Sequence, residues 1–284
     1  MKKVIIIGAP RSGTNMLRDV LCSLPGVGTW PCDEINYIWR YRNAEKSTDE
    51  FTPEMASEKI RNYVAKQFEK IGKKYKLHTV VEKTCANSLR IGFLQKIFPD
   101  AYFIFIYRNG IDASVSARKR WHARLDISYI IKKAKYVPPL DLPRYAIKYL
   151  KNRLYLIFSG EKQLATWGPK INNLEQLTKK LELIEVCGEQ WNTCVLKSIK
   201  GLELLPEKQV FKISYESFVQ KPEKYFNNIC EFLNIDISNE NLCSAVSTVS
   251  ATSVGKGEST LNNKERSLLL SHIEKGLKAL NYAV

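Results

Sequence analysis

Short runs of apolar, often β-branched residues alternate along this chain with longer segments in which apolar residues recur every three or four positions. The short runs are typical of buried parallel strands, and the longer spacing is typical of amphipathic helices. Strands that alternate with helices predict an α/β fold, with a parallel sheet flanked by helices in a three-layer sandwich and ligands at the carboxyl ends of the strands. The expected strands are Lys3–Ile7, Thr79–Glu82, Tyr102–Tyr107 and Gln209–Ser214.

The helical pattern also divides the chain into regions. From Trp121 to about Leu204 the sequence is helical, aromatic and basic and is interrupted by prolines, so we expect a helical insertion on the acceptor side of a single domain that spans residues 1–284. The polar stretch from Ser247 to Asn263 predicts a loop. Outside the insertion, the expected helices are Asn15–Leu24, Thr52–Lys70, Ser88–Phe98, Asp112–Ala123, Pro222–Leu233 and Asn263–Leu280.

The loop after the first strand predicts an anion-binding site. A strand, a glycine-containing loop and a helix N-terminus bring backbone N–H groups and a helix dipole to one place. Gly8 and Gly13 have the spacing of the nucleoside-triphosphate P-loop, but Thr14 stands where the phosphate-binding Lys should be and Asn15 where the magnesium-binding hydroxyl should be. The basic residue is Arg11 instead. This P-loop-like segment favours transfer of a group other than a magnesium-chelated phosphoryl.

A second anion-binding element follows the third predicted strand. Arg108 comes directly after that strand, and Ser116 lies in the helix that follows. An Arg at a strand end and a hydroxyl one to two turns into the next helix can both reach one phosphate. This strand lacks the terminal Asp that holds magnesium in many kinases and ATPases.

Composition leaves the class of partner open. The 284 residues carry 44 Lys and Arg against 29 Asp and Glu, a formal net charge of +15, spread along the chain. This charge fits anionic ligands, nucleic acid or membrane headgroups, or a general excess of Lys. No nucleic-acid motif accompanies it, so we expect no nucleic-acid partner. The seven cysteines include no C-x-x-C pair, which favours reduced thiols, a cytoplasmic location and no metal site.

Four segments together resemble sulfotransferases that use 3′-phosphoadenylyl sulfate (PAPS), over roughly residues 1–120 and 205–260. Gly8–Thr14 and Tyr107–Ser116 resemble the two signature segments of that family, with Arg108 and Ser116 eight positions apart. Val81–Asn87 is similar to the E-K-T-x-x-N strand end of bacterial and carbohydrate-type members. Ile213–Phe218, followed by Pro222 and Glu231–Leu233, resembles a later family segment. The resemblance implies a P-loop-like fold and PAPS as the donor, with no metal required.

The resemblance also implies roles for individual residues. Arg108 and Ser116 would bind the 3′-phosphate, and Tyr215 would lie near the adenine. Lys256 and Gly257 would complete the 3′-phosphate site, although the family's Arg-Lys-Gly is only partly present. The residues that would bind the 5′-phosphosulfate are Arg11, Ser12, Gly13, Thr14 and Asn15.

Sulfuryl transfer needs fixed cations near the departing oxygen and a base for the acceptor hydroxyl. Glu34 is the expected base, because glycan-modifying members place a catalytic Glu soon after the first helix, and Asp33 is the alternative. Lys83, together with Arg11, is the expected catalytic cation. Cys85 stands where cytosolic members have a His, and His122 is expected on the acceptor side or in a structural role. The aromatic neighbours that could raise the pKa of Glu34 are Trp30, Tyr37 and Trp39.

These observations predict direct sulfuryl transfer from PAPS to a hydroxyl, on a glycan or glycolipid, with peripheral contact to a membrane-bound acceptor possible. Two alternatives remain open: a nucleotide or small-molecule kinase, and a non-catalytic phosphonucleotide-binding module. Aromatic rings of the middle segment would shape the acceptor pocket, although packing in a helical core explains any single ring equally well. These rings are Trp121, Tyr129, Tyr136, Tyr145, Tyr149, Tyr155, Trp167 and Trp191.

Overall fold

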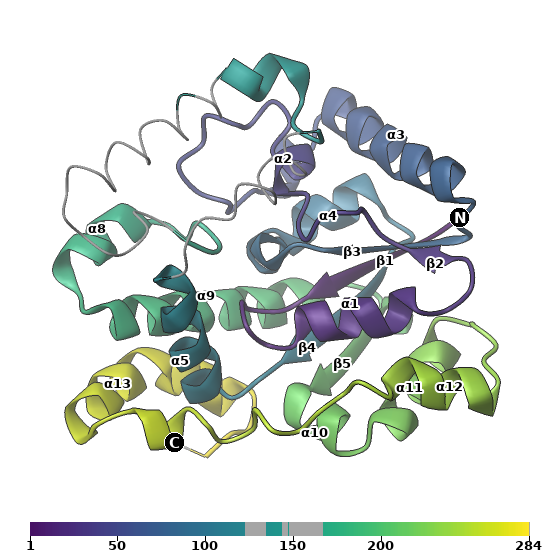
Figure 1. Ribbon diagram of the computed structural model, residues 1–284. Helices are drawn as coiled ribbons and strands as arrows, with labels where there is room; N and C mark the ends of the chain where they lie inside the picture. Colours follow the sequence, from purple (N-terminus) through teal and green to yellow (C-terminus); the bar gives the residue numbers. More distant parts are fainter. Residues whose placement is uncertain (123–134, 144–146, 148–166, 284) are drawn as a thin grey trace.

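A parallel five-stranded sheet forms the centre of the molecule (Figure 1). The computed structural model describes residues 1–122, 135–143, 147 and 167–283. The strand order is β2-β3-β1-β4-β5, with helices on both faces. This arrangement confirms the predicted α/β fold class. The strands are β1 (Lys2–Ile7), β2 (Val27–Gly28), β3 (Thr79–Lys83), β4 (Tyr102–Tyr107) and β5 (Val210–Ser214).

The register aligns the carboxyl ends of the strands. Ile6 of β1 pairs with Lys83 of β3, and Tyr107 of β4 pairs with Ser214 of β5. Because all pairs are parallel, the residues that follow each strand lie along one edge of the sheet. The loop after β1, the β3 end and the β4 end are therefore neighbours.

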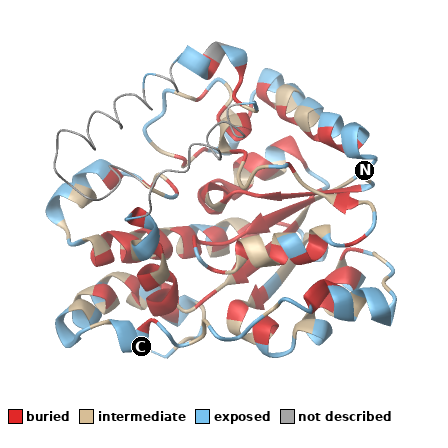
Figure 2. Ribbon diagram, in the orientation of Figure 1, coloured by how far each residue is buried: buried red, intermediate tan, exposed pale blue. Residues whose placement is uncertain are grey.

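Alternating residues of β1 face two separate apolar clusters. Ile5 and Ile7 face a cluster with α2 (Asn36–Trp39), α3 (Glu58–Tyr75) and α4 (Ile91–Ile97). Val4 and Ile6 face the opposite side, where the sheet is also buried (Figure 2). The helices on that side are α1 (Thr14–Cys22), α10 (Tyr215–Gln220), α11 (Pro222–Phe232) and α12 (Asn239–Val246).

A third cluster joins α5 (Gly110–Trp121), α9 (Leu183–Leu202) and α13 (Asn263–Ala279), with α8 (Leu174–Lys180) beside them. The long helix α9 falls within the expected insertion, yet it packs against α5 and α13 as part of the main body. The reason is its composition, since Trp191, Cys194 and Val195 are fully buried in this cluster. Much of the remaining insertion, including Tyr129, Tyr145, Tyr149 and Tyr155, lies outside the described residues.

Several element boundaries differ from the sequence prediction. The helix expected from Thr52 is a 3₁₀ turn, Pro53–Met55, followed by α3, which is capped after Tyr75 by Lys76 in the left-handed region. Proline starts a turn well but does not commit the chain to an α-helix. The helix expected from Ser88 is likewise divided into a 3₁₀ segment, Cys85–Leu89, and α4. The other 3₁₀ segments are Pro139–Asp141, Glu207–Gln209 and Glu258–Thr260.

Two further observations concern the chain as a whole. Every cysteine is a free thiol, and four of the seven are partly or fully exposed to solvent. Among the described residues, no helix is both long and apolar enough to cross a bilayer.

Candidate active site

The loop between β1 and α1 follows a path that its two glycines permit. Gly13 has φ of 88°, and a Cβ there would lie 2.5 Å from the ring of Tyr215. A Cβ at Gly8 would lie 2.5 Å from the carbonyl oxygen of Ile106 on β4. Arg11 also has a positive φ, of 68°. The loop is therefore held tightly between the ends of β4 and β5.

The loop has the donors that an anion requires. Thr14 opens α1, with Asn15 next to it, so the helix N-terminus points to the loop. Ser12 is fully buried, and its Oγ has no hydrogen-bond partner among the described residues. A buried hydroxyl without a partner, beside a helix N-terminus, fits a phosphate or sulfate oxygen.

Arg108 connects this loop to three other segments. Its guanidinium donates to the carbonyl of Arg11 at 3.3 Å, to Asp112 Oδ2 at 3.3 Å and to the carbonyl of Ser253. Its Cζ lies 4.5 Å from the ring centre of Tyr215, in a cation–π contact. The Nε of Arg108 is buried and has no partner within the described part of the chain. The Nε of Arg108 can therefore donate a hydrogen bond to one more acceptor.

Asp112 fixes the loop that contains Lys256 and Gly257. Its Oδ1 accepts from the Gly257 N–H at 2.6 Å, and its Oδ2 accepts from the Gly255 N–H at 2.8 Å. A Cβ at Gly257 would lie 2.8 Å from Asp112, so the backbone approaches α5 closely. The loop predicted to complete the 3′-phosphate site therefore lies against the helix that begins just after Arg108.

Arg11 and Ser116 touch each other. The Nε of Arg11 donates to Ser116 Oγ at 3.0 Å. The resemblance assigned Arg11 to the 5′-phosphosulfate and Ser116 to the 3′-phosphate, so the two expected subsites are adjacent here. Burial lowers the pKa of Arg11, and the nearby guanidinium groups of Arg120 and Arg108 lower it further. This concentration of positive charge favours an anionic ligand.

Glu34, Asp33 and Lys83 form an ion-paired group at the end of β3. The Lys83 Nζ lies 3.0 Å from Glu34 Oε1 and 3.1 Å from Asp33 Oδ1. Glu34 Oε1 also accepts from the N–H of Cys85 at 3.2 Å. The Lys83 side chain is 2% exposed, whereas that of Glu34 is 26% exposed. A buried cation and a partly accessible carboxylate therefore lie next to each other at the edge of the sheet.

The two acidic neighbours differ in their electrostatic surroundings. Burial would raise the pKa of Asp33, but Lys83 and a 2.6 Å ion pair with Arg18 lower it to about 2. Burial would lower the pKa of Lys83, but Glu34, Cys85 and Asp33 together raise it above its ordinary value. Asp33 is therefore a weak proton acceptor, and Lys83 stays charged. Burial raises the pKa of the Cys85 thiol to about 12, so this thiol also stays protonated.

The aromatic surroundings expected for Glu34 are only partly present. Trp30 and Trp39 pack edge-on against Phe68 in the core, with ring centres 4.7 and 5.7 Å away. Tyr37 lies near Glu34. Burial raises the pKa of Tyr37, and the charges of Cys32 and Glu34 raise it further. Glu34 instead accepts hydrogen bonds from the Lys83 ammonium group and the Cys85 N–H, which lie at the end of β3 and directly after it.

Other sequence candidates occupy different places. His122 caps the C-terminal end of α5 and is exposed. Trp121 and Trp191 are buried in the core between α5 and α9. Sequence reasoning missed Arg18 and Asp112, although each lies four positions after a predicted site residue, Thr14 and Arg108 respectively. That spacing is the signal that could have found them.

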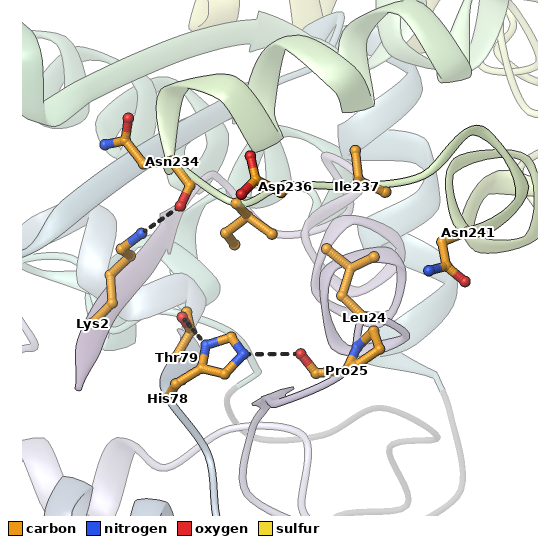
Figure 3. Close-up of a pocket in the computed structure, with 10 residues that line it drawn as sticks. Lys2, Leu24, Pro25, His78, Thr79, Asn234, Asp236, Ile237 and Asn241 are labelled. Carbon is orange, nitrogen blue, oxygen red and sulfur yellow. Dashed lines mark hydrogen bonds between the residues drawn. The ribbon is translucent and has the colours of Figure 1, made fainter.

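A cavity of about 470 Å³ lies elsewhere, at the amino ends of β1 and β3 (Figure 3). His78 contacts the Pro25 carbonyl at 3.0 Å and Thr79 Oγ1 at 3.1 Å, and Lys2 donates to the Asn234 carbonyl at 3.3 Å. These polar groups already contact one another, and they lie at the edge of the sheet opposite the glycine loop. Among the described residues, no cluster of three or more His, Cys, Asp or Glu could hold a metal ion.

Comparison with known proteins agrees with this geometry. Residues 3–137 match the model of the Sulfotransferase family. No curated protein sequence gives a significant match.

Solved sulfotransferase structures have the same fold. The sulfotransferase domain of the curacin biosynthetic pathway aligns with TM-score 0.56 at 14% identity, covering 100% of this chain and 98% of that one. The domain from the Synechococcus PCC 7002 olefin synthase aligns with TM-score 0.55 at 14% identity, with 100% and 96% coverage. Mouse sulfotransferase SULT7A1, solved with PAP, aligns with TM-score 0.52 at 14% identity, with 99% and 89% coverage. The amino-terminal part of the chain, residues 3–137, is therefore similar to the Sulfotransferase family, and the whole chain has the fold of solved sulfotransferases.

Proposed function

We propose that this protein transfers a sulfuryl group from PAPS to an acceptor hydroxyl by a direct, in-line reaction. The acceptor oxygen would bond to sulfur as the bond from sulfur to the bridging phosphate oxygen breaks, and adenosine 3′,5′-bisphosphate (PAP) would leave. The observation that carries the proposal is the meeting of the glycine loop, Arg108 and Tyr215 at one edge of the sheet, beside the pair of Glu34 and Lys83.

The donor site would use the hydroxyl, backbone N–H and guanidinium groups around the glycine loop. Ser12 Oγ, the N–H groups at the start of α1 and Arg11 would bind the 5′-phosphosulfate. Arg108 and Ser116 would bind the 3′-phosphate, the loop of Lys256 and Gly257, which Asp112 holds in place, would complete this site, and Tyr215 would lie near the adenine. Thr14, Asn15 and Gly13 complete the loop. The support is physical, since buried donors and guanidinium groups gather here without a matching number of carboxylates.

The proton of the acceptor hydroxyl would pass to Glu34. Glu34 is the better acceptor of the acidic pair, because Asp33 is held between Lys83 and Arg18 with its pKa near 2. Lys83, buried and charged, would stabilise negative charge that develops on the departing oxygen, together with Arg11. A carboxylate that accepts one proton and two fixed cations are sufficient for this reaction.

For the acceptor we propose a hydroxyl on a glycan or glycolipid. The support is the resemblance of Val81–Asn87 to carbohydrate-type members and the presence of Glu34, rather than a His after Lys83-Thr84, as the nearest candidate base. Tyr37 and Tyr136, both partly buried near Cys32, offer rings on the side of Glu34. Sugar rings pack well on aromatic faces.

Calorimetric titration tests the donor proposal directly. PAP without magnesium is compared with adenosine 5′-monophosphate and with ATP plus magnesium, at one salt concentration. We expect PAP to bind at least about 100-fold more tightly than the monophosphate, because the 3′-phosphate adds charge-assisted contacts. Equal affinities, or tighter binding of magnesium-ATP, would overturn the proposal and favour the kinase alternative.

A further inference from the structure

Buried polar side chains lie directly behind the segment that carries Glu34. Glu82, Thr84 and Asn87 are fully buried, and Arg90 is 2% exposed. Burial of such groups is costly unless they are paired, so their partners indicate what they hold in place. The proposed reaction uses none of these four residues.

One chain of hydrogen bonds runs from the Glu34 segment to Glu82 through Thr84. The Ile35 N–H donates to Thr84 Oγ1 at 3.3 Å, and the Thr84 hydroxyl donates to Glu82 Oε1 at 2.5 Å. A hydroxyl has one proton and two lone pairs, so Thr84 can accept from the Ile35 N–H and donate to Glu82 at the same time. The Ile35 N–H can only donate, so the proton of the Thr84 hydroxyl is left for Glu82.

A second chain reaches the other oxygen of Glu82. Arg90 donates to Asn36 Oδ1 at 2.7 Å and, through Nε, to Asn87 Oδ1 at 2.9 Å. Asn87 Nδ2 in turn donates to Glu82 Oε2 at 2.6 Å. Both chains end on Glu82, which is the common acceptor, and they attach to two consecutive residues after Glu34.

The residue before Glu34 is held as well. Arg18 donates to Asp33 Oδ1 at 2.6 Å and to the Asp33 carbonyl at 3.3 Å. The backbone on both sides of Glu34 is thus attached to side chains of other elements. A carboxylate that must meet a substrate proton needs this kind of fixed backbone, since a displacement of about 1 Å can cost on the order of 100-fold in rate.

We propose that Glu82 and Thr84 are positioning residues that hold Glu34 beside Lys83 and orient it for the acceptor proton. This inference rests on the proposed function for its catalytic consequence, but the positioning itself can be measured without a substrate. Thr84→Val keeps the shape of the side chain and removes the hydroxyl, which leaves the Ile35 N–H and Glu82 Oε1 without their partner.

The seven cysteines provide a probe of the segment itself. Selective ¹⁵N-cysteine labelling gives seven amide signals, assigned by single substitutions. Cys32 reports on the segment, one residue before Asp33, and the buried Cys187, Cys194 and Cys230 report on the rest of the fold. In Thr84→Val we expect the Cys32 amide to exchange with solvent at least about tenfold faster, with the three buried signals unchanged. Thr84→Ser should match the unaltered protein.

The catalytic consequence is measured as PAP formation from PAPS, alongside PAP affinity. We expect Thr84→Val to lower kcat about tenfold or more, with KM for PAPS and Kd for PAP unchanged within about threefold, and Thr84→Ser to restore kcat. A normal Cys32 exchange rate in Thr84→Val, or a normal kcat, would overturn the positioning role. Failure of the unaltered protein to bind PAP would overturn the proposed function instead, and the Cys32 measurement would still decide the positioning role.

Discussion

Arg108 illustrates how one side chain can connect remote parts of a sequence. It contacts the loop after β1, the first turn of α5, the aromatic ring that opens α10 and the loop at Ser253. These contacts hold the guanidinium in place before any ligand arrives, which lowers the cost of ordering it on binding.

The first prediction concerns Arg108 and the 3′-phosphate. We expect Arg108→Ala to raise the Kd for PAP about 100-fold, because about two charge-assisted hydrogen bonds are lost, and to change the Kd for adenosine 5′-monophosphate by less than about threefold. The measurement is calorimetric titration with both nucleotides. Arg118→Ala is the matched control, since Arg118 lies on α5, the helix that follows Arg108, but pairs with Glu265 at 2.6 Å. Equal weakening for both nucleotides would contradict the assignment.

The second prediction separates the two acidic residues. We expect Glu34→Gln to lower kcat by about 100-fold or more, since general-base catalysis contributes on the order of 100- to 10,000-fold, with PAP affinity retained. Asp33→Asn should lower kcat much less, because Asp33 is already held between Lys83 and Arg18. PAP formation and PAP titration measure both effects. A larger loss in Asp33→Asn would reverse the two roles.

The third prediction follows from the burial of Glu82. Burial raises the pKa of Glu82 from 4.5 to about 7, although its hydrogen bond with Thr84 opposes the shift. The folded state therefore holds a proton that the unfolded chain releases. This contribution to stability is fully present below about pH 4.5 and is lost as the pH rises through about 7.

Urea unfolding at pH 5 and pH 8 measures this effect. The contribution of Glu82 to the free energy of unfolding should be larger at pH 5 by roughly 2–3 kcal/mol, since a tenfold change in proton affinity corresponds to about 1.4 kcal/mol. Glu82→Gln should lose this part of the pH dependence, because glutamine does not titrate. An identical pH dependence in both proteins would contradict the raised pKa.

At the scale of elements, the sequence predicts those strands and helices that are long enough to show an apolar pattern within one segment. Four of the five strands were predictable from their apolar runs, which are largely buried on both faces in β1, β3 and β4 and partly buried in the edge strand β5. The two-residue strand β2 and the four-residue helix α2 were not, since neither is long enough to show a period. Residues that directly follow strands could be grouped in advance, because parallel strands end together.

Contacts between loops and helices could not be predicted in this way. The ion pair of Glu34 with Lys83 joins residues 49 positions apart, and the bonds of Asp112 to Gly255 and Gly257 span more than 140. No spacing rule links such positions. Each becomes a neighbour only after the sheet and its helices have assembled.

The fourth prediction tests the attachment of the loop at Lys256. Trypsin cleaves after lysine, and the loop is exposed at Lys256 but tied by its neighbours to Asp112. We expect Asp112→Ala to speed cleavage after Lys256 at least about tenfold, because local opening becomes easier. Mass spectrometry of timed digests measures this. Asp100→Ala, at an exposed turn, is the control, and unchanged cleavage in Asp112→Ala would contradict the attachment.

At the scale of the whole molecule, Trp191 links the third cluster to the candidate active site. Its ring lies where α5, α9 and α13 meet, and a Cβ at Gly110 or Gly276 would approach the ring to 2.8 or 2.6 Å. The indole N–H donates to the carbonyl of Arg108 at 3.2 Å. Helix α9, expected in the insertion, therefore supports the site from within the main body.

The fifth prediction concerns this close packing. We expect Gly276→Ala to lower the free energy of unfolding by about 1–3 kcal/mol, because the added methyl group must displace the Trp191 ring. Urea unfolding measures the change. Ser271→Ala, on the exposed side of the same helix, should change stability by less than about 0.5 kcal/mol. An unchanged stability in Gly276→Ala would mean that the ring can move freely.

The four-way contact of Arg108 has a consequence for the life of the protein in a cell. The proposed donor site exists only while Arg11, Arg108 and Ser253 are together, so only the native state would bind the nucleotide. By mass action, a ligand at about 100 times its Kd stabilises the native state by about 2.7 kcal/mol. The supply of donor would then govern turnover of the polypeptide itself: a starved cell would lose the protein to proteases faster than a cell with donor to spare.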